Sequence, residues 1–290
     1  MESIGDIMVK IIVDSTQDLT KEILEKNDVE VVPLTVNFSD GESYLDGVTI
    51  QTAELYEKVK EKKELPKTAA VTVGTLIDVF KKHIDNGDEI VYTGISAQMS
   101  RSYENALLAK EELGTDKIYV VDSKNLSTGI GLLILKAIKD RDSGLSAKEI
   151  AKNMEKNREL VLSQFAIEQM DYLYKGGRCS SVAKIFGSIL KIKPIILVRD
   201  GKMHVGAKPL GKITKALDIM INQIVADKDR LDTDHILVTH SIAPSSRDYI
   251  MEKLKPLFPN VDIIETVAGS VIASHCGPGT IGILYMVKEK

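Results

Sequence analysis

Residues 89–121 read EIVYTGISAQMSRSYENALLAKEELGTDKIYVV, and the alternation within this stretch decides the fold class. The apolar runs at 89–93 and 117–121 are typical of buried strands. Between them, the pattern from about 100 to 113 predicts a helix. A strand, a helix and a second strand in this order form a unit whose two strands lie parallel, so the stretch predicts a parallel sheet covered by helices.

The same alternation extends through the first half of the chain. Strands are predicted at 9–13 and 29–36, and helices at 19–26, 52–62, 72–84 and 125–142. Thr52 and Thr72 are expected to be the N-caps of their helices. The segment from Ser146 to Glu149 is a capping box and predicts the start of one more helix.

The pattern restarts near Leu160 and predicts a second sheet. Strand-like runs lie at 161–166, 195–198, 203–207, 235–239, 261–266 and 281–287. Asp200-Gly201 lies between two of these runs and is typical of a hairpin turn, so this sheet should be partly antiparallel. We therefore predict two packed α/β domains, one at 9–160 with a mainly parallel sheet and one at 161–290 with a mixed sheet.

The composition is that of an ordinary globular protein. The 38 Lys and Arg against 42 Asp and Glu give a net charge of -4, which offers no general attraction to nucleic acid. The longest apolar run, 130–138, is interrupted by Lys136 and is too short to span a bilayer. No secretory signal is visible at the N-terminus, and two distant cysteines do not predict a disulfide framework. We expect a cytoplasmic protein with no nucleic acid partner and no integral membrane segment.

Polar residues gather where predicted strands end or helices begin. The four clusters are Asp14-Ser15-Thr16, 68–72, 96–102, and Asp122-Ser123 with Ser127-Thr128-Gly129. Ligands collect at the carboxyl ends of strands in open α/β sheets, and hydroxyls with helix N-terminal amides suit an anion. Ser and Thr also cap helices, and spacing alone does not decide between capping and ligand contact.

The segment 269–282, GSVIASHCGPGTIG, places His275 among small residues, so a ligand or another backbone should come close there. It contains a formal GxGxxG at Gly277, Gly279 and Gly282. That pattern indicates a dinucleotide site only between a strand and a helix, whereas here an apolar, strand-like run follows. We therefore reject a nucleotide site at these glycines.

Metal and covalent chemistry find little support in the spacing of residues. His235 and His240 are five apart on a predicted strand and so point to opposite faces. His275 and Cys276 have no further ligand at a metal-like spacing. No nucleophile elbow or Walker motif is present, so we predict no metal, no cofactor and no catalytic residue.

The segment Lys175-Gly176-Gly177-Arg178 is basic and glycine-rich but lacks the spacing of a phosphate-binding loop. The guanidinium of Arg178 suits a phosphate or a carboxylate on a partner, and a solvated loop arginine is the alternative.

Taken together, these stretches resemble the DegV family over nearly the whole chain from Val9 onward. The opening at 14–19 resembles DSTxDL, 122–131 resembles DSxxxSxGxG, 172–178 resembles YLxKGGR, Lys193-Pro194 resembles the KP that follows, and 274–280 resembles SHxGPGT. The segments Val32-Pro33-Leu34, Asp40-Gly41-Glu42 and 44–47 resemble the family's second-strand signature.

Two segments depart from the family pattern. Where TSQPS is common, this chain has Thr68-Ala69-Ala70-Val71-Thr72. Where SSxLSGTYxxA is usual, Arg101 replaces the glycine that follows Ser100. Arg101 would either add a charge near the head group or point to solvent.

The resemblance implies a fatty-acid-binding protein, since DegV members bind fatty acids and include the acyl-carrying subunit of bacterial fatty acid kinase. It implies that Thr68 and Ser100 hold the carboxylate with His275 nearby. The acyl tail of a long-chain fatty acid would enter an apolar tunnel between the two domains. Helix faces around Ile185, Ile189 and Leu190 would build part of that tunnel.

The chain itself would not be an enzyme. It would present the carboxylate to a separate ATP-binding fatty acid kinase subunit, which would form the acyl phosphate used as a phospholipid precursor. Lys175 and Arg178 would lie at the tunnel mouth, against the partner or the transferred phosphate.

Two other hypotheses remain open. The chain would be a self-contained hydrolase or phosphotransferase if His275 acted as a general acid or base in the same cleft. Alternatively, Ser100 and His275 would be satisfied core residues without a ligand.

Overall fold

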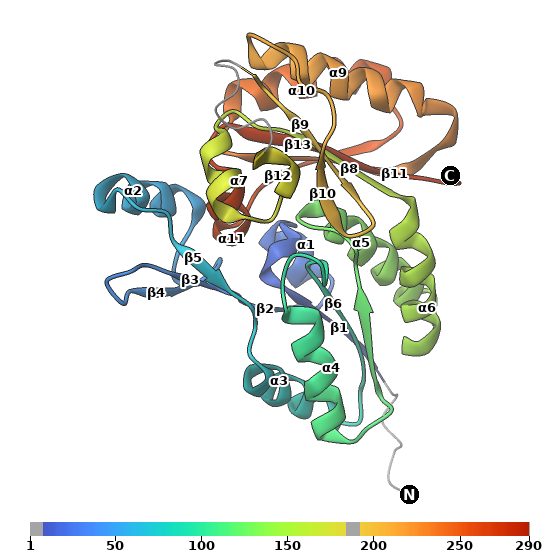
Figure 1. Ribbon diagram of the computed structural model, residues 1–290. Coiled ribbons are helices and arrows are strands. Elements are labelled where there is room, and N and C mark those ends of the chain that lie inside the picture. The colour runs from blue at the N-terminus through green and yellow to red at the C-terminus, as the bar shows by residue number, and fades with distance from the viewer. Residues whose placement is uncertain (1–7, 184–191, 290) are drawn as a thin grey trace, which may run out of the picture.

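The computed structural model describes residues 8–183 and 192–289 and arranges them in layers around two main sheets (Figure 1). The first sheet has the order β2-β1-β6-β7, and every neighbouring pair is parallel, as predicted. Its strands are β1 (Val9–Asp14), β2 (Val29–Val32), β6 (Glu89–Gly94) and β7 (Ile118–Asp122).

Helices cover both faces of this parallel sheet (Figure 1). The helices are α3 (Val73–Asp85) and α4 (Ser102–Leu113) on one face, and α1 (Lys21–Lys26), α5 (Thr128–Asp142) and α6 (Ala147–Asn157) on the other. Successive side chains of a strand point to opposite faces. Ile12 therefore joins the core beneath α3, whereas Ile11 and Val13 join the core beneath α5.

The second sheet is mixed, as predicted, with the order β10-β9-β8-β13-β11-β12. Its strands are β8 (Val161–Ala166), β9 (Ile195–Arg199), β10 (Lys202–Val205), β11 (Leu231–Ser241), β12 (Asp262–Val267) and β13 (Thr280–Val287). Only β11 and β12 pair in parallel in this described sheet. The helices α9 (Ile213–Ala226) and α10 (Pro244–Leu257) pack with its outer core.

Helix α5 lies between the two sheets and is buried almost all around, since residues 128–134 are all buried. One hydrophobic core joins α5 to the parallel sheet and to Phe165 and Leu284 of the mixed sheet. Because this core spans both sheets, the division into domains at 9–160 and 161–290 stays a prediction.

Local signals in the sequence were accurate. Asp200 and Gly201 both have positive φ, 49° and 75°, which fits the two-residue hairpin turn predicted there. The Ser146 hydroxyl accepts the amide of Glu149, and the Glu149 carboxylate accepts the amide of Ser146, so the capping box is confirmed.

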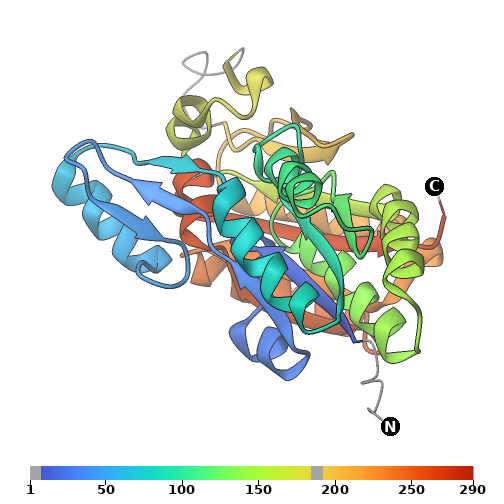
Figure 2. The same ribbon diagram turned by 90° about the horizontal axis from the view of Figure 1, so that it is seen from below.

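The predicted strand at 29–36 is wrong, because the chain forms two strands there. Pro33 has no N–H for a strand ladder, and β2 ends before it. The next strand, β3 (Thr35–Asn37), joins a separate antiparallel sheet with β4 (Ser43–Leu45) and β5 (Lys67–Ala69). With α2 (Thr52–Lys62), this small sheet forms an arm that projects from the body (Figure 2).

The arm is anchored on the second half of the chain. Thr52 is not the N-cap of α2, since Gln51 holds that position; the Thr52 hydroxyl instead donates to the carbonyl of Ala268. The Tyr56 hydroxyl is hydrogen-bonded to the Ser241 hydroxyl, and its ring packs edge-on against Tyr172 at 6.0 Å. These contacts fix the position of β5 relative to the mixed sheet.

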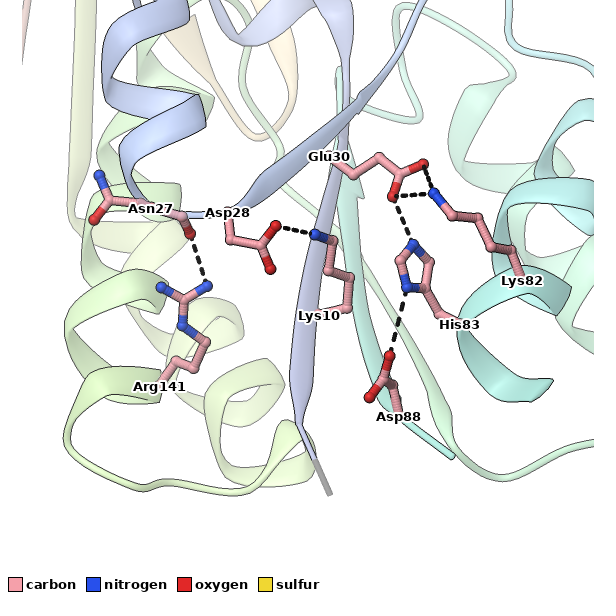
Figure 3. Close-up of polar contacts among 8 residues, drawn as sticks. All are labelled: Lys10, Asn27, Asp28, Glu30, Lys82, His83, Asp88 and Arg141. Carbon is pink, nitrogen blue, oxygen red and sulfur yellow. Dashed lines mark hydrogen bonds and ion pairs between the residues drawn. The ribbon is translucent and has the colours of Figure 1, made fainter. Parts of the chain in front are cut away.

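Ion pairs, and one hydrogen bond from Arg141 to the backbone carbonyl of Asn27, tie together the end of the parallel sheet at which the strands begin (Figure 3). The residues involved are Lys10, Asn27, Asp28, Glu30, Lys82, His83, Asp88 and Arg141. His83, at 6% exposure, lies between two carboxylates: Nε2 is 2.5 Å from Glu30 and Nδ1 is 3.5 Å from Asp88. This end of the sheet is therefore closed by internal ion pairs. No helix within the described residues is long and apolar enough to cross a membrane.

Candidate functional site

A cavity of about 460 Å³ lies at the opposite end of the parallel sheet, where the strands finish. Its apolar wall includes Leu34, Ile95, Met99, Leu126, Met203 and Ile272. Its polar residues include Thr68, Ser100, Arg101, Asn105, Arg178 and His275. A mainly apolar cavity of this size with a few convergent polar groups is typical of a small-molecule site.

Three separate parts of the chain supply the polar residues. Thr68 comes from β5 of the arm, and Ser100 from the loop between β6 and α4. His275 comes from α11 (Ser270–Cys276), which lies next to α7 (Met170–Gly176) (Figure 1). The fold thus brings Thr68, Ser100 and His275 to one cavity, although Thr68 and His275 are 207 positions apart.

His275 has one hydrogen-bonded nitrogen and one free nitrogen. Its Nε2 is 2.9 Å from the Thr68 hydroxyl, while its buried Nδ1 has no partner in the described part of the chain. Burial, with a smaller contribution from the charge of Arg178, lowers the pKa of His275 to about 4. The imidazole is therefore neutral at pH 7.

Gly176, the last residue of α7, makes room for this ring. A Cβ at position 176 would lie only 2.6 Å from His275 Nδ1, closer than a methyl group can approach. The absence of a side chain at position 176 is therefore explained by the close approach of the His275 ring.

Ser100 precedes the first turn of α4. Its hydroxyl is 3.2 Å from that of Ser102, and the Asn105 side chain donates to the Val71 carbonyl at 2.7 Å. Ser100, Arg101 and Asn105 all line the cavity, so the N-terminal end of α4 faces it. The positive end of the helix dipole favours an anion at this position.

Two guanidinium groups border the cavity. Arg101 Nε donates to Glu104 at 3.2 Å and its side chain is 78% exposed, so Arg101 reaches toward solvent at the rim. Arg178 Nη1 donates to the carbonyl of Gly176 at 2.8 Å. No carboxylate lines the cavity in the described residues. Lys175 is exposed on the last turn of α7 and lies outside the lining, and Ile185, Ile189 and Leu190 fall outside the described residues.

Residues 8–288 match a family model that is described as "Uncharacterised protein, DegV family". The chain belongs to the DegV family.

Related DegV proteins match almost end to end. A DegV domain-containing protein of Clostridium perfringens is 35% identical over 281 residues, covering 96% of this chain and 98% of the relative. A DegV family protein from Thermus thermophilus, whose structure describes fatty acid binding, has a TM-score of 0.90 at 25% identity, over 97% of this chain and 100% of that one. A stearic acid-binding protein from Eubacterium ventriosum has a TM-score of 0.87 at 29% identity, over 97% and 99% of the two chains.

In two of the four polar clusters of this DegV chain, the side chains form hydrogen bonds within the protein. The Asp14 carboxylate accepts the amides of Thr16 and Ile95, at 3.0 and 2.9 Å. The Ser123 hydroxyl donates to the Gly94 carbonyl at 2.6 Å, and that of Ser127 to Asp18 at 2.5 Å. The other two clusters supply Thr68 and Ser100 to the cavity.

The small residues of 269–282 have close neighbours, as the sequence indicated. A Cβ on Gly277 would lie 2.8 Å from the ring of Tyr172. The amide of Gly279 donates to the Ser241 carbonyl at 2.7 Å, and β13 follows directly. Gly277 and Gly279 thus form the turn between α11 and β13, while Gly282 lies within β13.

Several lining residues were missed. Asn105 lies in the first turns of α4, close in sequence to Ser100. Its place near the polar start of a predicted helix could have marked it as a lining residue. Met203 comes from a distant element and carried no local signal, whereas Ile272 lies within 269–282, the segment expected to have a close neighbour, but was not itself selected. A second, smaller cavity of about 30 Å³ shares Leu126, Ile272 and Cys276 with the first and continues toward Phe165 and Leu284.

Proposed function

We propose that this chain binds a long-chain fatty acid in the 460 Å³ cavity, with the carboxylate at the end formed by Thr68, Ser100 and His275. The observation that carries the proposal is the composition of the cavity wall, in which two hydroxyls, a neutral imidazole, two guanidiniums and the amides of Gln98 and Asn105 meet a mainly apolar lining. The structures from Thermus thermophilus and Eubacterium ventriosum support it, since both are described as binding fatty acids.

The proton of His275 sits on Nε2 in this proposal. A proton on Nδ1 would leave a buried N–H without an acceptor, which costs about 1 to 3 kcal/mol. With Nε2–H donating to the Thr68 oxygen, the Thr68 hydroxyl hydrogen is free to donate to the ligand carboxylate. Ser100 supplies a second hydroxyl donor, and such bonds to a charged acceptor are the stronger kind.

The tail provides most of the affinity. At about 0.8 kcal/mol per buried CH₂, roughly fourteen methylenes contribute about 11 kcal/mol before the cost of association. Head-group bonds contribute about 1 to 3 kcal/mol each and set the orientation. The tail would run past Ile272 and Cys276 toward the smaller cavity.

This orientation places the carboxylate beside the arginines at the rim. We propose that a separate ATP-binding kinase subunit docks there, in the cytoplasm. The ligand carboxylate oxygen would attack the γ-phosphorus, the bond to ADP would break, and acyl phosphate would remain in the cavity. The fork of Arg178 suits the phosphoryl group, and exposed Lys175 would contact the partner.

The test is to purify the protein from bacteria, extract it with organic solvent and analyse the extract by mass spectrometry. A stoichiometric fatty acid is expected, and the stripped protein should take up palmitate. A protein that carries no lipid and takes up none would contradict the proposal. The protein alone should not hydrolyse ATP.

A second function is suggested by the Thr68–His275 pair, since a hydroxyl 2.9 Å from a neutral imidazole is the geometry of an activated nucleophile. A hydrolase of this kind would turn over a small ester or phosphate by itself and lose that activity in His275→Ala. If Ser100→Ala and His275→Ala changed only stability, with lipid content unaltered, both residues would be structural.

A further inference from the structure

Helix α11 carries four residues of the cavity wall: Val271, Ile272, His275 and Cys276. Two carboxylates from the first half of the chain hold the beginning of this helix. The amide of Gly269 donates to Asp18 at 2.8 Å, and the amide of Ser270 donates to Asp46 at 2.7 Å.

Each carboxylate also binds a hydroxyl with its other oxygen. Ser127 donates to Asp18 at 2.5 Å, and Ser15 donates to Asp46 at 2.8 Å. The exposed fractions of Asp18 and Asp46 are only 5% and 2%. The two side chains therefore connect α11 to the segments that begin α5 and follow β1.

The two carboxylates crowd the same small space. A Cβ on Gly269 would lie 3.2 Å from the nearest oxygen of Asp18 and of Asp46. Burial and the neighbouring carboxylates, Asp14 included, raise the pKa of both groups, that of Asp46 to about 6. Burying two like charges together is unfavourable, and their hydrogen bonds to helix N-terminal amides offset part of this cost.

We propose that Asp18 and Asp46 are positioning residues of the ligand site, which hold the first turn of α11 so that His275 reaches Thr68 and Ile272 lines the cavity. The expected effect of these two residues on fatty acid binding rests on the proposed function. His275 lies five residues beyond Ser270, about 7.5 Å along the helix. Its bond to Thr68 is lost beyond about 3.5 Å, so a shift of well under 1 Å at the helix suffices to break it.

Asp18→Asn and Asp46→Asn test this role, since each keeps the shape and replaces one of the two accepting oxygens with an NH₂ group. Each should raise the Kd for palmitate about tenfold, as expected for loss of one buried hydrogen bond. Each should also shift the ¹⁵N resonances of the His275 imidazole in the ligand-free protein, because Nε2 loses Thr68.

Asp227→Asn is the matched control. Asp227 is also buried, at 5% exposure, and accepts the Tyr285 hydroxyl at 2.6 Å, but it does not line the cavity. It should lower the melting temperature to a similar extent and leave both the Kd and the imidazole resonances unchanged.

The inference is overturned if Asp18→Asn and Asp46→Asn lower the melting temperature as the control does, with no change in Kd or in the resonances. If either variant fails to fold, Ser127→Ala and Ser15→Ala take its place, because each removes the hydroxyl that donates to one carboxylate. Each should raise the Kd for palmitate about threefold. Unchanged binding in both serine variants would also overturn the inference. Wild-type protein that binds no palmitate would contradict the proposed function, while the imidazole resonances would still report on the position of α11.

Discussion

The two ends of the parallel sheet each hold a buried histidine, and the two rings differ in what surrounds them. His83 lies at the starting ends of the strands with a carboxylate on each side, Glu30 and Asp88 (Figure 3). His275 lies at the finishing ends, where one nitrogen meets the Thr68 hydroxyl and the other has no partner in the described residues. A ring flanked by two acids cross-links the fold, whereas the ring of His275 is bonded to a hydroxyl that itself lines the cavity.

The cations at the two ends differ in the same way. Lys10 pairs with Asp28 at 2.5 Å, and Lys82 pairs with Glu30 at 3.4 Å. At the cavity, Arg101 pairs with Glu104 on the exposed rim, whereas Arg178 donates to a backbone carbonyl and has no carboxylate partner among the described residues. Residue type alone therefore does not distinguish the residues at the cavity from those that only stabilise the fold. The difference between Arg178 and the two lysines lies in whether the side chain is paired with a carboxylate.

Removing the ring of His275 should have the largest effect, on the pH dependence of stability. The unfolded imidazole takes up a proton below its ordinary pKa of 6.5, and the folded one only near 4. Wild-type protein should therefore lose roughly 3 kcal/mol relative to His275→Gln as the pH falls from 6.5 to 4. Urea unfolding of both proteins across this range measures the difference.

Protonation of Asp46 changes the stability of the fold in the opposite direction over much of the same pH range. Its folded pKa of about 6 lies above the ordinary 3.8, so protonation stabilises the fold as the pH falls from 6 to 4. Asp46→Asn should thus make the acid-induced loss of stability steeper than in the wild type. Parallel stability curves for wild type, His275→Gln and Asp46→Asn would argue against both assignments.

Filling the space beside His275 should have the next largest effect. Gly176→Ala places a methyl group against Nδ1 and should displace the ring, raising the Kd for palmitate about thirtyfold, as overpacking typically costs 1 to 3 kcal/mol. Gly74→Ala on α3 is the matched control, because its Cβ meets nothing within 4 Å. Titration of both variants with palmitate would show whether the ring position matters.

Exchanging each histidine for glutamine tests the comparison directly. His275→Gln should weaken palmitate binding about tenfold through the lost link to Thr68. His83→Gln should lower the free energy of unfolding by about 1 to 3 kcal/mol, because its two carboxylates lose their partner, while binding stays unchanged. Weaker binding in His83→Gln would remove the distinction between the two ends of the sheet.

The smallest effect is expected at the rim. Arg101→Gly, which restores the residue usual in the family, should raise the Kd about twofold at low salt and have no effect at high salt, since the side chain is largely exposed. Palmitate titrations at two ionic strengths measure it. An effect independent of salt would indicate that Arg101 contacts the carboxylate directly.

The sequence predicted both sheets, the Asp200-Gly201 turn and the Ser146 capping box, because alternation and turn chemistry are local. The resemblance to the DegV family, rather than any local pattern, selected Thr68, Ser100 and His275, which the fold brings to one cavity. The arm was missed because one residue, Pro33, interrupts what reads as a continuous strand.

Long-range partners were beyond the reach of local patterns. Asp18 belongs to the segment that resembles DSTxDL, yet it binds the amide of Gly269, 251 positions away. Met203 and Ile272 join the cavity only because β10 and α11 fold back onto the first half. Such contacts depend on tertiary packing, which periodicity does not encode.

The position of β13 within its sheet affects how the chain folds during synthesis. This strand lies between β8 and β11, although it follows both in the sequence. While the protein is being made, the facing edges of β8 and β11 must therefore stay unpaired until β13 emerges from the ribosome and inserts. Open edges of this kind invite aggregation, and closure by a distant strand is slow. Nascent chains that stop short of α11 and β13 would lack both a closed sheet and a complete cavity wall, so they would expose apolar surface and strand edges that favour aggregation.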